Sequence, residues 1–275
     1  MPVIPVNGTE LFYRTLGGGY PCLLMHGGFG MDHTYFHPWL DPIGDVFEFV
    51  SYDHRCNGRS GRPPVATLTF SQLCDDADAL RAALGFEQTA VLGHSAGGFV
   101  ALEYALRYPG RVSHLILAGT APVFDYGAEI AANIMRKGAT SEMMSIFAAP
   151  PAADDAAAAQ AFSVLMPLYF HTWDAEVAAR AFAETRWNAA AYACNERLFR
   201  TYNVLPRLHE LNMPALIVTG DDDFICPPSQ ARHMHAALRD STLSVMEDCG
   251  HFPFIEQPEA FRALVRGWWK NVRGI

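Results

Sequence analysis

The chain has 275 residues, of which 50% are hydrophobic, and its formal net charge is −9 at pH 7. A net negative charge argues against nucleic acid and anionic membrane surfaces as partners, because both attract basic patches. The apolar content suffices to cover both faces of a parallel sheet, so the composition favours one compact α/β domain carrying an insertion.

The N-terminal residues 1–5 contain no basic region and no long apolar core, so we expect neither a signal peptide nor a membrane anchor. No apolar run is long enough to span a bilayer. Six cysteines without paired metal-ligand spacing lie mostly in apolar or strand-like segments, at positions 22, 56, 74, 194, 226 and 249. Such usage is typical of reduced, packed thiols. We therefore expect a cytoplasmic monomer or homodimer whose partner is a small molecule.

Strand-like and helix-like segments alternate along most of the chain. Strand patterns fall at residues 3–6, 11–15, 22–25, 47–52, 90–93, 114–118 and 215–218, and a short one ends at 245–246. Apolar residues recur at helical spacing over 71–84, 99–107, 229–238 and 259–269. This alternation predicts a mostly parallel sheet flanked by helices and joined by right-handed crossovers.

The composition changes between roughly residues 123 and 205, where alanine, methionine and aromatic residues dominate and strand patterns nearly vanish. We interpret 123–205 as an inserted helical cap, with residues 1–122 and 206–275 forming the core beneath it. Aromatic side chains that could roof an apolar pocket are Tyr169, Phe170, Trp173, Phe182, Trp187 and Tyr192.

A Gly-x-Ser-x-Gly string centred on Ser95 follows the apolar run 90–92 and precedes a helical pattern that begins near Gly98. A strand, a sharp turn and a helix would present Ser95 as an exposed nucleophile. The turn holds the serine backbone at positive φ, so its neighbours two residues away must be small, as Gly93 and Gly97 are. Alone, such a string can also be an ordinary glycine-rich loop.

A second glycine-rich loop, residues 26–30 (HGGFG), follows the buried run 22–25. Its glycines let backbone amides turn toward a substrate, so we expect it to form half of an oxyanion hole. The other half would be the amide of Ala96, at the start of the helix after Ser95. Gly28 or Phe29 would supply the partner amide.

An acid and a base follow Ser95 in the order that an elbow hydrolase requires. The acidic loop 221–223 comes after the strand pattern 215–218, and Pro227 suits a turn and helix start beyond Asp223. His251 lies on a glycine-containing loop before the last helix. A serine hydroxyl needs an imidazole to take its proton and a carboxylate to fix the imidazole tautomer, so these residues together predict nucleophilic acyl transfer.

With these motifs the chain resembles the α/β-hydrolase superfamily with a helical cap, and most closely its proline iminopeptidase-like hydrolases. The resemblance also includes residues 52–55 (YDHR) and 58–60 (GRS). It implies an α/β-hydrolase fold, with a mostly parallel sheet flanked by helices and an inserted cap. The family spacing of glycine, acid and proline selects Asp223 as the triad acid, which leaves Asp221 and Asp222 as solvated loop carboxylates.

Two positions depart from the aminopeptidase pattern of that subgroup. Its oxyanion loop usually carries proline where this chain has Phe29, whose ring we expect at the pocket mouth. Some members carry a glutamate directly after the triad acid to hold a substrate ammonium, where this chain has Phe224. The pair Asn195 and Glu196 is similar to the other amine-binding segment, although Glu196 also suits an exposed helix. The residues expected at the substrate are Phe29, His94, Trp187, Glu196 and Phe224.

These observations predict a serine hydrolase that cleaves a small, largely apolar carboxylic ester or lactone through an acyl-enzyme formed on Ser95. The alternative is a proline iminopeptidase with the same triad. A carbon–carbon bond hydrolase and a cofactor-free perhydrolase stay open, whereas a non-catalytic binder is disfavoured because all three triad residues are present.

We expect no metal and no cofactor. His233 and His235 stand two apart on a predicted helix, so their side chains diverge. The glycines at 17–19 form a turn between strands and do not open a phosphate-binding helix.

Overall fold

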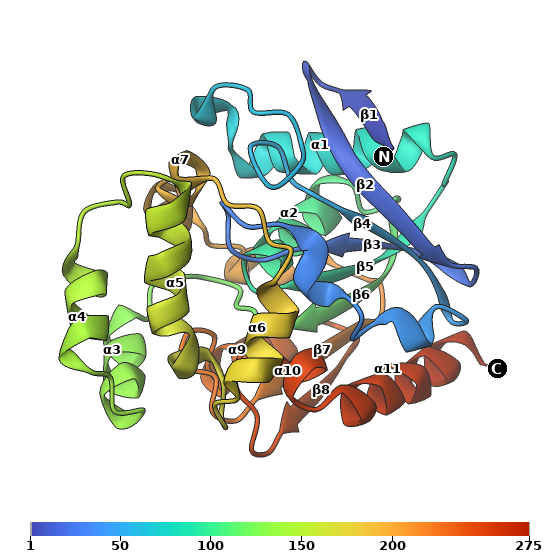
Figure 1. Cartoon of the computed structure of the whole chain (residues 1–275). Coiled ribbons are helices and arrows are strands. Elements are labelled where there is room, and N and C mark those ends of the chain that lie inside the picture. Colours follow the sequence, from blue (N-terminus) through green and yellow to red (C-terminus); the bar gives the residue numbers. More distant parts are fainter. Residues whose placement is uncertain (1, 275) are drawn as a thin grey trace.

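One eight-stranded sheet forms the centre of the protein, which a computed structural model describes over residues 2–274 (Figure 1). The strands are β1 (Val3–Val6), β2 (Thr9–Gly17), β3 (Tyr20–Met25), β4 (Phe47–Tyr52), β5 (Thr89–His94), β6 (Val112–Ala118), β7 (Ala215–Gly220) and β8 (Ser241–Met246). Their order is β1-β2-β4-β3-β5-β6-β7-β8. The β1–β2 and β2–β4 pairs are antiparallel, and the remaining pairs are parallel. The predicted fold class is confirmed.

Helices cover both faces of this sheet. They are α1 (Phe70–Ala83), α2 (Ala96–Arg107), α9 (Pro228–Ala237), α10 (Pro253–Glu256) and α11 (Pro258–Arg273). Short 3-10 helices span His33–Phe36, Asp41–Ile43, Val65–Thr67 and Leu205–Glu210. The four helices expected from apolar spacing are all present, but α2 begins at Ala96, directly after the serine turn and earlier than the pattern near Gly98 indicates.

Successive strand residues point to opposite faces, which divides the apolar core into two layers. Leu23 of β3 and Val91 of β5 belong to a buried cluster with residues of α1, α2 and α9. Leu24 and Leu92 belong to a second cluster with residues of α11. The strands are therefore apolar on both faces, as a parallel sheet covered by helices requires.

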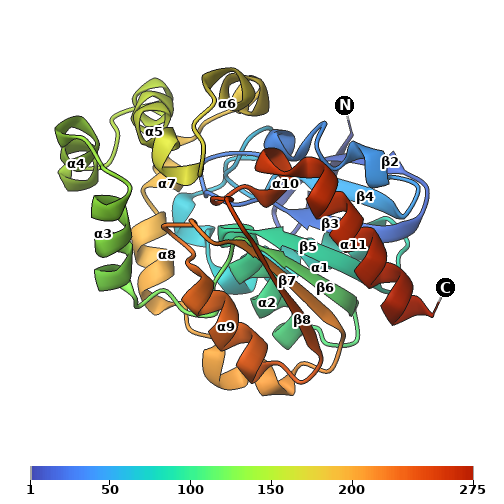
Figure 2. The same cartoon turned by 90° about the horizontal axis from the view of Figure 1, so that it is seen from below.

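Six further helices lie between β6 and β7 and stand away from the sheet, beyond the end where the parallel strands finish (Figures 1 and 2). They are α3 (Gly127–Arg136), α4 (Ser141–Ala148), α5 (Asp155–Tyr169), α6 (Ala175–Phe182), α7 (Ala189–Tyr192) and α8 (Asn195–Thr201). We call these helices and the loops that join them the insertion. An antiparallel bridge between Val123 and Asn203 joins its two ends, so the chain leaves and re-enters the core at one place.

Among residues 2–274, no helix combines the length and the apolar composition that crossing a membrane requires.

Candidate active site

The three predicted triad residues follow three strands of the parallel part of the sheet. Ser95 comes directly after β5, Asp223 shortly after β7, and His251 on the loop that follows β8. Parallel strands end at a common edge, so residues that follow different strands meet there. The topology brings together side chains that are 156 positions apart in the chain (251 minus 95).

Ser95 has a strained backbone, with φ +53° and ψ −126°. A non-glycine residue in such a region costs about 1–3 kcal/mol, which the surrounding structure must offset. A Cβ atom on Gly93 would lie 2.6 Å from the carbonyl oxygen of Gly97, and one on Gly97 would overlap the backbone of Met25. Both glycines thus have the steric role that the sequence predicts, and the turn projects Ser95 out of the sheet edge.

His251 and Asp223 form a hydrogen-bonded pair. The Nδ1 atom of His251 lies 2.7 Å from Oδ2 of Asp223, and both residues are almost completely buried. The other carboxylate oxygen accepts hydrogen bonds from the amides of Ile225 at 3.0 Å and Cys226 at 2.9 Å. These bonds orient the carboxylate, and the carboxylate in turn leaves the Nε2 atom of His251 free to accept a proton.

The hydroxyl of Ser95 and the imidazole of His251 line the same cavity. Within residues 2–274 the Ser95 hydroxyl makes no hydrogen bond of its own. Catalytic hydrogen bonds are commonly long without substrate and tighten when it binds. Ser95 and His251 are therefore candidates for a nucleophile and base that pair when a substrate occupies the cavity.

The loop 26–31 presents unused backbone amides beside Ser95. Three of its amides are engaged: Gly27 donates to the Tyr35 hydroxyl at 2.6 Å, Gly30 to Asn57 Oδ1 at 2.5 Å, and Met31 to the Gly28 carbonyl at 2.9 Å. Within residues 2–274, no group accepts a hydrogen bond from the amides of Gly28 or Phe29. Gly28 has φ +62° and lines the cavity together with Ala96. Gly28 and Ala96 are thus the candidate donors for an oxyanion hole, which requires two amides that point to one substrate oxygen.

The ring of Phe29 does not lie at the pocket mouth, contrary to our expectation. The side chain is completely buried and packs against His54, Phe70 and Phe199, with ring centroids 6.0 to 6.3 Å apart. The left-handed Gly28 turns the chain so that the following side chain enters the apolar core. Phe29 is therefore not among the residues that line the cavity.

His94 lines the cavity next to Ser95, but both of its ring nitrogens have protein partners. Nδ1 lies 2.9 Å from the Tyr35 hydroxyl, and Nε2 lies 2.9 Å from the carbonyl oxygen of His251. Burial lowers the pKa of His94 well below its usual value, so the ring is neutral at pH 7. It holds two catalytic loops together and has no hydrogen-bonding atom left for a substrate.

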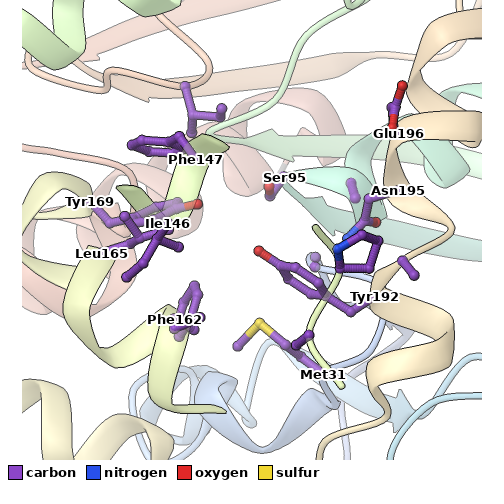
Figure 3. Close-up of a pocket in the computed structure, with 18 of the residues that line it drawn as sticks. Met31, Ser95, Ile146, Phe147, Phe162, Leu165, Tyr169, Tyr192, Asn195 and Glu196 are labelled. Atoms are coloured by element: carbon purple, nitrogen blue, oxygen red, sulfur yellow. The ribbon is translucent and has the colours of Figure 1, made fainter. Parts of the chain in front are cut away.

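The cavity has a volume of about 510 Å³ and mostly apolar walls (Figure 3). Ser95 lies between a wall from α4 and α5, which includes Ile146, Leu165 and Tyr169, and a facing wall that includes Tyr192. A cavity of this size fits a small molecule. Of the six aromatics expected as a roof, Tyr169 and Tyr192 line it directly, with Met31 and Phe162 beside them.

Other residues expected at the substrate take different places. Phe224 is fully buried and packs against Tyr169, with ring centroids 4.9 Å apart, so it lies behind the wall. Trp187 likewise supports the wall from behind, against Phe162 at 5.2 Å. Glu196 does line the cavity, yet its side chain is 80% exposed and forms an ion pair with Arg200 one turn along α8.

In the acidic loop, Asp221 is exposed as expected, whereas Asp222 is not a solvated carboxylate. The side chain of Asp222 is only 14% exposed and pairs with Arg136 at 2.6 Å and with Lys137, both from the insertion. Burial acts to raise the pKa of Asp222, but Lys137 and Arg136 outweigh it and hold this pKa below its usual value. No local pattern marks this pairing, because it joins segments 85 positions apart.

The cysteines are all free, and burial raises the pKa of five of them, those at 22, 56, 74, 226 and 249. Thiols in this state are poor nucleophiles. Within residues 2–274, the single group of side chains with metal-ligand spacing comprises Asp223, Cys226 and His251. Two of these three residues, Asp223 and His251, hydrogen-bond each other.

Residues 21–258 match the family described as alpha/beta hydrolase fold. The chain therefore belongs to the α/β-hydrolase family, which confirms the resemblance inferred from its motifs.

Similar proteins carry several activities on this fold. A proline iminopeptidase from Pestalotiopsis fici, PfmaB, is 31% identical over 277 residues, which cover 96% of this chain and 97% of that protein. The esterase EaEST from Exiguobacterium antarcticum aligns with a TM-score of 0.79 at 22% identity over 98% of both chains. An enol-lactonase from Burkholderia xenovorans LB400 aligns with a TM-score of 0.76 at 22% identity over 97% of this chain and 99% of that chain. The two structural likenesses show the fold alone.

Proposed function

We propose that this protein is a serine hydrolase that cleaves a small, largely apolar carboxylic ester or lactone through an acyl-enzyme. The observation that carries the proposal is the buried His251–Asp223 hydrogen bond of 2.7 Å beside the strained Ser95. A neutral imidazole oriented by a carboxylate is the base that a serine nucleophile needs.

In the first half of the reaction, the Ser95 oxygen attacks the substrate carbonyl carbon while its proton passes to Nε2 of His251. The carbonyl oxygen becomes an oxyanion that accepts hydrogen bonds from the amides of Gly28 and Ala96, each worth roughly 3–4 kcal/mol to the transition state. When the intermediate collapses, His251 returns the proton to the leaving alcohol, and Ser95 carries the acyl group.

In the second half, a water molecule attacks the acyl carbon as His251 takes one of its protons. The same two amides hold the second oxyanion. Its collapse releases a carboxylic acid and restores the Ser95 hydroxyl, so the cycle needs only the triad, the two amides and water.

The walls of the cavity support an apolar substrate. Most of the lining side chains come from aliphatic and aromatic residues of the insertion. Phe224 offers no charge after the triad acid, and Glu196 is already paired with Arg200. A substrate ammonium would therefore lack a dedicated buried counter-ion, which favours esters and lactones over N-terminal proline amides.

The insertion is proposed to act as a cap, with residues 1–122 and 206–275 as the catalytic core. Residues of α4, α5, α7 and α8 all contribute to the cavity over Ser95. We also propose a cytoplasmic location, which the six free cysteines support.

The alternative function is a proline iminopeptidase, which is what the relative that is 31% identical is named for. Glu196 at the cavity is the residue that favours it, because its carboxylate could bind an N-terminal ammonium if Arg200 moved away.

Initial rates on p-nitrophenyl butyrate and on proline p-nitroanilide separate the two functions. We expect the wild-type protein to cleave the ester, and the Ser95→Ala variant to lose activity by at least about 10⁴-fold. Strong proline amide hydrolysis that falls in Glu196→Gln would establish the alternative. Ester hydrolysis that persists in Ser95→Ala would contradict the mechanism altogether.

A further inference from the structure

The loop that carries His251 is held by a carboxylate that the mechanism above does not use. Glu256 ends the short helix α10, and its side chain turns back toward this loop. The amide of Gly250 lies 3.0 and 3.1 Å from the two carboxylate oxygens, and the amide of Phe252 lies 3.2 Å from one of them. Glu256 therefore binds the residues directly before and directly after His251.

The same carboxylate reaches the insertion. The amide of His171, in the segment between α5 and α6, donates to Glu256 at 2.8 Å. In the same region the amide of His251 itself donates to the carbonyl oxygen of Tyr169 at 2.7 Å. The His251 loop is thus joined to residues 169–171 by one direct hydrogen bond and by a second one through Glu256.

Gly250 allows this close approach. A Cβ atom at position 250 would lie 2.8 Å from the amide nitrogen of His171, so a side chain there would separate the loop from the insertion. The carboxylate of Glu256 occupies the resulting junction and serves as the acceptor for all three amides.

Burial disfavours the ionised form of the Glu256 carboxylate. Burial raises the pKa of Glu256, and the amides of His171, Gly250 and Phe252 act against that rise. An ionised carboxylate accepts such hydrogen bonds more strongly than a neutral amide would, because charge-assisted bonds are about twice as strong. Glutamine has a similar shape, but its amide has one acceptor oxygen where the carboxylate has two.

We propose that Glu256 is a positioning residue, which holds His251 in register with Asp223 and Ser95 by binding the amides on either side of it and joining them to the insertion. This inference rests on the proposed serine hydrolase function. It predicts that loss of the carboxylate lowers the rate of acyl transfer while the substrate cavity, which Glu256 does not line, still binds substrate.

The test compares Glu256→Gln with Glu259→Gln, a matched control three residues along the chain. Glu259 is 83% exposed and pairs with Arg262 on the surface of α11. We expect kcat for p-nitrophenyl butyrate to fall by about 10- to 100-fold in Glu256→Gln, because small displacements of a catalytic group have effects of that order. KM should change less than about twofold, since cavity contacts are retained. Glu259→Gln should match the wild type in both.

Two substrate-independent measurements separate this proposal from the proposed function. One is the rate at which a fluorophosphonate labels Ser95; the other is the proton NMR signal of the hydrogen on Nδ1 of His251. In Glu256→Gln the labelling rate should fall with kcat, and the NMR signal should shift or broaden. If the wild-type protein is labelled but does not cleave the ester, the substrate assignment fails while Glu256 is still tested by labelling. If the wild type is not labelled, the nucleophile assignment fails and the NMR signal still tests Glu256.

A folded Glu256→Gln protein with wild-type labelling and an unchanged NMR signal would overturn the proposal. If that variant does not fold, the same measurements are made on Glu256→Asp, which keeps the charge but withdraws it from the amides by one methylene. Wild-type behaviour of a folded Glu256→Asp protein, or failure of both variants to fold, would equally overturn it, because Glu256 would then support the fold alone.

Discussion

The Nε2 atom of His94 lies 2.9 Å from the backbone carbonyl oxygen of His251. On the other side of the ring, Nδ1 of His94 accepts a hydrogen bond from the hydroxyl of Tyr35, which itself accepts one from the amide of Gly27. A continuous chain of hydrogen bonds therefore joins the loop that carries Gly28 to the loop that carries His251, through the residue directly before Ser95.

Tyr35→Phe tests this chain. The substitution removes only the hydroxyl and leaves the Gly27 amide and the His94 ring unsatisfied in the core, which should lower the free energy of unfolding by about 1–3 kcal/mol. We also expect a several-fold loss of kcat/KM, because both loops lose a common support. Urea unfolding and ester kinetics measure the two effects.

The matched control is Tyr13→Phe, since the Tyr13 hydroxyl makes no hydrogen bond within residues 2–274. Equal unfolding free energies for the two variants would show that the Tyr35 hydroxyl contributes nothing to the connection.

Asp223→Asn tests the identity of the triad acid. An asparagine in this place cannot hold the tautomer of His251 that leaves Nε2 unprotonated, so kcat should fall by about 10⁴-fold. Asp221→Asn should retain activity within a small factor, because its hydrogen bond with the Cys249 amide uses an oxygen that asparagine keeps. A larger loss of kcat in Asp221→Asn than in Asp223→Asn would show that Asp223 is not the triad acid. Fluorophosphonate labelling gives the same comparison without a substrate.

Lys137→Met and Arg136→Met compare a buried and an exposed partner of the same carboxylate. The side chain of Lys137 is 7% exposed and that of Arg136 is 54% exposed. Removing the buried cation leaves Asp222 only partly compensated, so we expect a loss of about 2–3 kcal/mol in unfolding free energy. The exposed cation should contribute less than about 1 kcal/mol. Urea denaturation of both variants measures these two effects, and equal losses of unfolding free energy would contradict this ranking.

Acid should destabilise the protein once the pH falls below about 6.5, the usual pKa of histidine. Burial lowers the pKa values of His26, His54 and His94. In the unfolded chain these rings take up protons below about pH 6.5, whereas the folded protein keeps them neutral. The unfolded state then binds more protons, so stability is complete above that pH and declines as the pH falls below it.

Three such groups correspond to a slope of up to about 4 kcal/mol per pH unit in this range. We expect the melting temperature to fall sharply between pH 7.5 and pH 5.5. A melting temperature that stays constant across this interval would show that the three rings titrate alike in the folded and unfolded states.

Sequence patterns were most informative for the parts of the candidate site that depend on local backbone geometry. The strained turn at Ser95 has room only for glycine two residues away on either side, and Gly93 and Gly97 make this requirement visible in the sequence. The strand patterns likewise indicate which loops reach the same sheet edge, so the meeting of Asp223 with His251 follows from element order. The direction of a side chain within a loop could not be predicted from the sequence. Phe29, for example, enters the core because Gly28 before it has a left-handed conformation.

By itself, the sequence determined the α/β-hydrolase fold and the three residues of the candidate triad, because strand periodicity and glycine placement are local properties. The tertiary structure alone decided which insertion side chains form the cavity, that Phe224 and Trp187 stand behind its walls, and that Asp222 and Glu256 join the catalytic loops to the insertion. Those contacts join segments tens of residues apart, and their formation depends on how the insertion helices pack against the core.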